Sequence, residues 1–184
     1  MADVAFQPPP IPVYLAHLPT VGGLVVPVIT PRHRNGMAAF GLVDRGRMDT
    51  CLREQRCGVC GRVMQGRMVF LLRQADLIRK CSVEPGLCPP CAAYTQAACP
   101  MVAGRMQHYR RTAPPFISRR CDDAACGCRA WTSQPEPARH GAPAEPWYAL
   151  WTRQYELMRD DKGNLVAGFA GLRVLVLREV KHRP

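Results

Sequence analysis

Cys57-Gly58-Val59-Cys60-Gly61 and Cys88-Pro89-Pro90-Cys91 are the two stretches that decide the fold of this chain. Each places two cysteines three positions apart, and 27 residues separate the two pairs. Because one tight turn can present both sulfurs of such a pair to a single ion, two pairs match the tetrahedral shell of Zn2+. The spacing predicts one zinc with four ligands, Cys57, Cys60, Cys88 and Cys91. A shell of four cysteines leaves no position for water, which favours a structural over a catalytic metal.

The residues around each pair predict the elements that carry it. Residues 44–56 have helix character and lead into the first pair, with Asp44 placed to cap the helix. The second pair opens onto an alanine-rich run after two prolines, which is how a helix begins. Between the pairs, residues 62–64 and 68–72 flank Gln65-Gly66-Arg67, a pattern typical of a short hairpin.

The predicted order of knuckle, hairpin and helix resembles a treble-clef zinc finger. The resemblance covers Cys57–Cys99, under a quarter of the chain, and the gap between the pairs is longer than the common ribbon spacing. Treble clefs serve ribosomal, nuclease, ubiquitin-system and purely structural roles, so the resemblance implies a local fold rather than an activity. The histidine–asparagine pattern of the nuclease branch is absent, since no histidine lies between Val59 and Gln107. In its Arg/Ala/Pro bias the chain also resembles short zinc-motif proteins of actinobacteria and their phages.

Three further cysteines cluster at Cys121, Cys126 and Cys128. They could hold a second metal, but C-x4-C-x-C is not a standard zinc hook, and a one-residue gap is tight for two ligands of one ion. A zinc or iron–sulfur site would need another ligand. The candidates for that ligand are Cys81, Cys99, His108 and His140. A redox-active dithiol and unligated thiols stay open as alternatives, and we expect Cys51 in the core and Cys99 packed beneath the first site.

Short β-elements are predicted toward both ends of the chain. Residues 25–29 are β-branched except for Pro27, and Asn35-Gly36 forms a turn from which residues 37–43 return. Toward the C-terminus, apolar runs on either side of a turn at residues 160–164 predict an antiparallel β-meander.

The aromatic side chains of the last region are expected to lie in the core. Trp147, Trp151 and Tyr155 fall near one face of the first predicted strand of the meander. Buried aromatic residues anchor small sheets more often than they form a stacking platform.

These elements together predict an α+β fold. We expect a small zinc-stabilised domain with short β-hairpins, a knuckle–hairpin–helix centre and the C-terminal meander. The expected organisation is a proline-rich arm at residues 1–12, a zinc-centred domain at 13–132, a linker or surface loop at 133–146, and the meander at 147–184, packed on the same domain.

The charge balance favours an acidic partner, with nucleic acid first. The formal net charge is +11, and four thiolates on one Zn2+ would reduce it to about +9. Basic and aromatic residues interleave in one region, which suits phosphate neutralisation with base stacking, while a solvated helix end and loop is the alternative. The candidate contacts are Arg105, His108, Tyr109, Arg110, Arg111, Arg119 and Arg120.

Enzyme signatures are lacking in the sequence. We find no phosphate-binding glycine loop, no zinc-protease motif and no hydrolase elbow, and the five histidines form no evident acid–base pair. The leading prediction is a basic, zinc-stabilised protein that binds nucleic acid. The alternatives are a protein-interaction or assembly factor with structural zinc that docks on an acidic protein surface, and a thiol- or metal-dependent enzyme using the 121–128 cysteines. Residues 1–12 lack a secretory pattern and no apolar run is long enough to span a membrane, so we expect a cytoplasmic protein.

Overall fold

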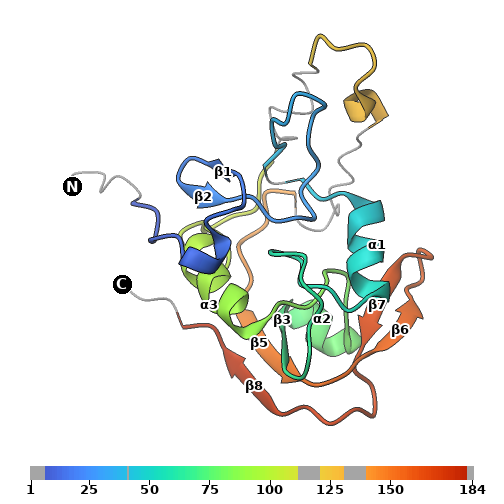
Figure 1. Cartoon of the computed structure of the whole chain (residues 1–184). Helices are drawn as coiled ribbons and strands as arrows, with labels where there is room; N and C mark the ends of the chain where they lie inside the picture. The colour runs from blue at the N-terminus through green and yellow to red at the C-terminus, as the bar shows by residue number, and fades with distance from the viewer. Residues whose placement is uncertain (1–6, 41, 112–120, 131–139, 182–184) are drawn as a thin grey trace.

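Helices and short antiparallel sheets are mixed along the chain, which confirms the predicted α+β class (Figure 1). The computed structural model describes residues 7–40, 42–111, 121–130 and 140–181. The helical elements in this part are η1 (Val13–Leu15), α1 (Arg45–Arg53), α2 (Gln74–Arg79), α3 (Pro89–Ala98) and η2 (Gly127–Ala130). The strands are β1 (Thr20–Val21), β2 (Leu24–Val25), β3 (Met68–Arg73), β4 (Cys81–Ser82), β5 (Trp147–Thr152), β6 (Glu156–Arg159), β7 (Leu165–Gly168) and β8 (Val176–Glu179).

The core is built on β3, whose residues form a nearly continuous apolar run. Such a run is typical of a strand buried on both faces. β3 pairs antiparallel with β5 in a three-stranded sheet of order β3-β5-β8. Phe70 in its centre is fully buried and lies edge-on to Tyr155 and Phe169, with ring centroids 5.4 and 4.8 Å away. These aromatic contacts join β3 to the segments around the second sheet.

The second sheet has the order β4-β7-β6, and its hairpin forms where the sequence predicts it. The Asp160 carboxylate accepts hydrogen bonds from the backbone N–H groups of Lys162 and Asn164, and Gly163 has a φ of 76°. A tight turn of this kind is closed by an aspartate that accepts nearby backbone hydrogen bonds and by a glycine in the left-handed conformation.

The predicted C-terminal meander is wrong in its topology. β5 belongs to the sheet with β3 and β8, whereas β6 and β7 lie in the other sheet. The run breaks after Thr152, whose hydroxyl donates to the Gln154 carbonyl and accepts from the Gln154 N–H. This local turn ends the ladder and directs Tyr155 into the core. Trp147 and Trp151 pack against the same core from β5.

The hairpin predicted across residues 62–72 does not form. Val63 makes a single bridge back to Arg56, while Val69 exchanges two backbone hydrogen bonds with Leu87, just before the second cysteine pair. α2 and β4 therefore occupy the excursion between Val69 and Leu87. The hydrogen-bonding edges of β3 are instead paired with β5 on one side and, at Val69, with Leu87 on the other. The full knuckle–hairpin–helix arrangement is not confirmed.

The N-terminal strand prediction is also wrong in extent. Regular pairing is limited to β1 with β2, and it ends before Pro27, which has no N–H to continue a ladder. The return strand at residues 37–43 is reduced to one bridge between Arg32 and Ala38. The tight turn between them does form, with Gly36 at a φ of 89°.

The helix α1 begins as predicted, because the Asp44 side chain accepts a hydrogen bond from the Arg47 N–H. Two contacts fix α1 on the sheets. The Arg45 guanidinium donates to the Leu165 carbonyl at 2.7 Å, and the Tyr155 hydroxyl donates to the Leu52 carbonyl. The end of α1 is thereby held directly before the first cysteine pair.

Gly86→Ala tests the tight packing around β3. A Cβ at Gly86 would lie 2.9 Å from the Phe70 Cζ atom, and the ring cannot move because it is fully buried. We expect a loss of roughly 1–3 kcal/mol in unfolding free energy, measured by denaturant titration. Gly46→Ala, in the exposed first turn of α1, is the matched control and should gain up to about 1 kcal/mol. Equal stability of the two variants would contradict this packing.

Candidate metal centre

The first cysteine pair lies in a tight turn whose backbone is hydrogen-bonded on both sides. The Cys57 N–H donates to the Arg62 carbonyl at 2.9 Å, and the Gly61 N–H donates to the Cys57 carbonyl at 2.8 Å. Gly61 has a φ of 73°, a conformation that costs other residues about 1–2 kcal/mol. This turn directs the sulfurs of Cys57 and Cys60 to the same side as α3.

The second pair lies at the start of α3, as the two prolines predict. Cys88 is the N-cap, and Pro89 and Pro90 occupy the first turn, where a missing N–H costs nothing. Cys91 follows in the same turn, and its side chain is fully buried. The positive end of the helix dipole therefore lies beside both sulfurs, which favours thiolates over thiols.

The structure brings the four cysteine sulfurs together. All four lie within 4.8 Å of one another, and the Cys60 and Cys88 Sγ atoms are 3.9 Å apart. Ligands of a tetrahedral zinc with bonds of about 2.3 Å are separated by about 3.8 Å, whereas disulfide sulfurs are about 2.05 Å apart. The Cys88 N–H also donates to the Cys57 sulfur at 3.4 Å. The donor set and its spacing fit a four-coordinate zinc.

The protonation of the four thiols is strongly coupled. A hydrogen bond with Cys57 lowers the pKa of Cys60, and lowers the pKa of Cys88 to about 7. Contact with Cys57 raises the pKa of Cys91, because the thiols share protons at short range. A divalent cation supplies the positive charge that would allow all four to ionise together.

Tyr14 lies close enough to sense this charge. Burial, together with the charges of the four cysteines, raises the pKa of Tyr14 to about 12. The phenol therefore stays neutral beside the site at physiological pH.

A second group of metal-ligand residues consists of His33, Cys121, Cys126 and Cys128. Their ligand atoms also lie within 4.8 Å of one another. A hydrogen bond from the Arg34 N–H to the Cys126 sulfur lowers the pKa of Cys126 to about 6. Sequence reasoning selected the three cysteines and missed His33. No local spacing marks it, because His33 lies 88 residues before Cys121.

The fourth ligands considered from the sequence do not join this group. Cys81 pairs in β4 with Gly168, and Cys99 caps α3 through its N–H. His108 forms a backbone bridge with Pro143, and His140 is exposed. Within the part of the chain that the structure describes, these two clusters are the groups of residues that could hold a metal.

The remaining cysteines pack as ordinary side chains. Cys51 is buried in α1, and burial raises its pKa. Cys99 is half-buried against the core cluster, and burial raises its pKa as well. None of the ten cysteines forms a disulfide.

The predicted basic–aromatic region is partly used for structure. Arg105 donates to the Ala97 and Ala98 carbonyls and so caps the end of α3. The Tyr109 hydroxyl donates to the Glu145 carboxylate at 3.1 Å, and burial raises its pKa to about 12. His108, Arg110 and Arg111 are exposed. Arg119 and Arg120 lie outside the described residues.

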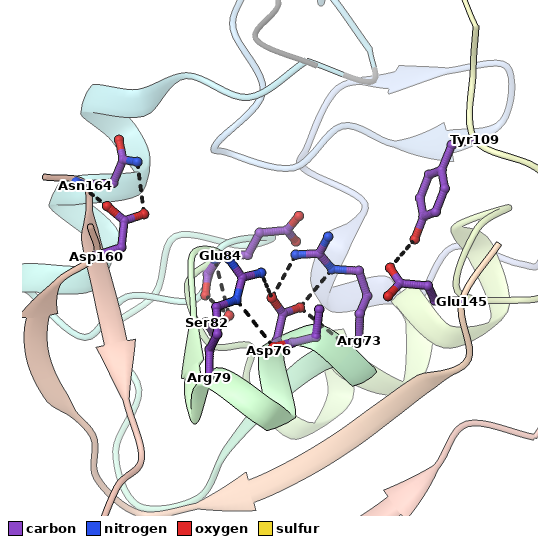
Figure 2. A network of polar contacts seen from close by, with 10 residues as sticks. Arg73, Asp76, Arg79, Ser82, Glu84, Tyr109, Glu145, Asp160 and Asn164 are labelled. Atoms are coloured by element: carbon purple, nitrogen blue, oxygen red, sulfur yellow. Dashed lines mark hydrogen bonds and ion pairs between the residues drawn. The ribbon is translucent and has the colours of Figure 1, made fainter. Parts of the chain in front are cut away.

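A buried ion pair lies near this tyrosine (Figure 2). The Arg73 guanidinium donates to both oxygens of the Asp76 carboxylate at 2.8 Å, and each side chain is only 5% exposed. Arg79 contacts the same carboxylate from the outside. Because cations occupy both carboxylate oxygens, Asp76 is suited to fixing α2 on β3 rather than to acid–base chemistry.

Comparisons with models of protein families, with curated proteins and with solved structures gave no match. The resemblances to treble clefs and to actinobacterial and phage proteins therefore stay predictions. Across the described residues, none of the helices combines the length and apolarity needed to cross a bilayer.

Cys91→Ser tests the first cluster, with Cys51→Ser as control, because both side chains are buried cysteines and only Cys91 belongs to the cluster. Binding to structural zinc contributes on the order of 10 kcal/mol to folding, about as much as a small domain's whole stability. We expect Cys91→Ser to lose one zinc per chain and to unfold, as measured by elemental analysis and circular dichroism. Cys51→Ser should keep the metal content of the unmodified protein. Equal zinc content in the two variants would refute the assignment.

Proposed function

We propose that the protein is a non-catalytic binding protein whose fold is stabilised by zinc. The observation that carries this proposal is the Cys57–Cys60–Cys88–Cys91 cluster, whose four sulfurs all lie within 4.8 Å of one another. Four protein ligands complete the coordination of zinc, so the metal would support the fold and activate no water. The cysteine turn followed by the α3 start supports a treble-clef-like module in which α2 and β4 are inserted.

We infer that the partner is nucleic acid. The support is the charge of +11 together with exposed basic side chains at His108, Arg110 and Arg111. The backbone there is held in place, because the Tyr109 N–H donates to the Ala142 carbonyl and the Gly141 N–H donates to the Arg110 carbonyl. Since the Tyr109 hydroxyl is bonded to Glu145, this surface would contact phosphates rather than stack bases.

Binding should show the salt dependence of phosphate contacts. We expect the logarithm of the affinity for DNA or RNA oligonucleotides to fall linearly with the logarithm of salt concentration. The double variant Arg110→Ala/Arg111→Ala should reduce that slope by about 2, one unit for each lost contact, measured by fluorescence anisotropy. The control is Arg153→Ala/Arg173→Ala, which removes the same charge from two exposed arginines elsewhere on the surface.

Two results would decide against this partner. If the salt dependence of the affinity has the same slope in both double variants, Arg110 and Arg111 make no specific phosphate contact. Binding to an acidic polypeptide such as polyglutamate, without binding to oligonucleotides, would instead support an acidic protein surface as the partner.

A further inference from the structure

The second cluster has the geometry of a complete metal shell. The Cys121 and Cys128 sulfurs are 3.5 Å apart, and the Cys126 sulfur lies 3.7 Å from the His33 Nδ1 atom. These two distances join different pairs, so they would be opposite edges of a tetrahedron formed by the four ligand atoms. Zinc bonds of about 2.3 Å to sulfur and about 2.05 Å to nitrogen give edges of about 3.8 and 3.6 Å. Both measured edges fall close to these values.

The backbone of residues 121–128 forms a turn that brings its three cysteines together despite their unusual spacing. The Asp123 carboxylate accepts from the Ala125 N–H at 2.9 Å, and the Cys126 N–H donates to the Asp123 carbonyl at 3.0 Å. This turn brings Cys121 back toward the other two cysteines. Gly127 starts η2 between them, and nothing lies within 4 Å of the position of a Cβ there.

The turn at residues 33–36 presents the fourth ligand. The His33 N–H donates to the Met37 carbonyl and the Gly36 N–H donates to the His33 carbonyl, so the backbone of His33 is fixed. The next residue contributes the Arg34 N–H, which donates to the Cys126 sulfur at 3.4 Å. An amide donor to sulfur stabilises the thiolate form in which a cysteine ligates a metal.

The cluster is buried without belonging to the hydrophobic core. His33, Cys126 and Cys128 are each less than 8% exposed, yet none of them is a member of the main core cluster. Figure 1 shows the 121–130 segment and the turn around residue 33 away from the two sheets. Small regions that bury little apolar surface need a disulfide or a metal to hold one conformation. The cysteines form no disulfide, so a metal is the remaining staple.

We propose that His33, Cys121, Cys126 and Cys128 form a second zinc site, which ties the 33–36 turn to residues 121–128. Three thiolates and a neutral imidazole around Zn2+ carry a net charge of −1, and all four positions are taken by protein ligands. Because the site lies outside the core, its zinc exchanges before the zinc of the four-cysteine site.

The first test counts zinc by elemental analysis of protein purified under reducing conditions. We expect two zinc ions per chain, and one in His33→Ala and in Cys126→Ser. His33→Cys should restore two, because a fourth thiolate replaces the imidazole. His140→Ala is the control, since His140 is an exposed histidine outside both clusters, and it should keep two.

The outcomes separate this proposal from the four-cysteine site. One zinc per chain that is lost in Cys91→Ser and kept in His33→Ala would overturn the second site and leave the proposed function intact. Iron with inorganic sulfide, or a Cys121–Cys128 disulfide in peptide mapping, would also overturn it. A count of two zinc ions per chain in His33→Ala would show that His33 is not a ligand, which contradicts the proposed site.

Stepwise removal gives an independent readout. A chelator titration should release the first zinc equivalent with little change in far-ultraviolet circular dichroism, and the second with unfolding. In Co2+-substituted protein, His33→Cys should intensify the sulfur-to-cobalt charge-transfer band, because a thiolate is added. An unchanged band would contradict ligation by His33.

Discussion

Closure of two distant cysteine pairs into one cluster of four sulfurs, which fits a zinc ion, is the constraint on which the rest of the fold depends. A segment of 27 residues separates the pairs, and because the pairs lie together in space, this segment must begin and end at the same place. A metal bound by both pairs would be released on unfolding, so its binding free energy would add directly to the stability of this closure. The bridge between Val69 and Leu87 lies directly before Cys88, so the same closure sets the position of β3.

Once β3 is held, the C-terminal third of the chain has a surface on which to fold. β5 pairs with it over six residues, and Tyr155 and Phe169 pack on Phe70 from segments that follow β5 and β7. Arg45 and Tyr155 then connect α1 to these segments. The two sheets are thus organised around one buried aromatic residue, Phe70, and its neighbour Val69 pairs with Leu87, directly before Cys88.

Structural features that depend on residues close together in the sequence could be predicted from the sequence. The Asp44 cap, the proline start of α3, the turn at residues 160–164 and the cysteine spacing are local features, and each is present. Long-range pairing is different, because the apolar run of β3 shows that it is buried without showing which strand lies beside it. The pairing of β3 with β5 and the approach of His33 to Cys126 both depend on such distant contacts. The meander and the 62–72 hairpin failed because both paired runs that are adjacent in sequence.

The net charge of the protein overstates the number of arginines that are available to bind an acidic partner, because several arginines make structural contacts. Arg45 and Arg105 donate to backbone carbonyls, and Arg73 is buried with Asp76. A guanidinium presents five donors in a rigid plane, which suits capping of helix ends and bidentate pairing with carboxylates as well as contact with phosphate. Arg73 adds to the long-range field but cannot reach a phosphate without breaking its buried ion pair, whereas Arg105 is exposed. If the partner is nucleic acid, as proposed above, the exposed arginines rather than the total of +11 would set the number of phosphates neutralised.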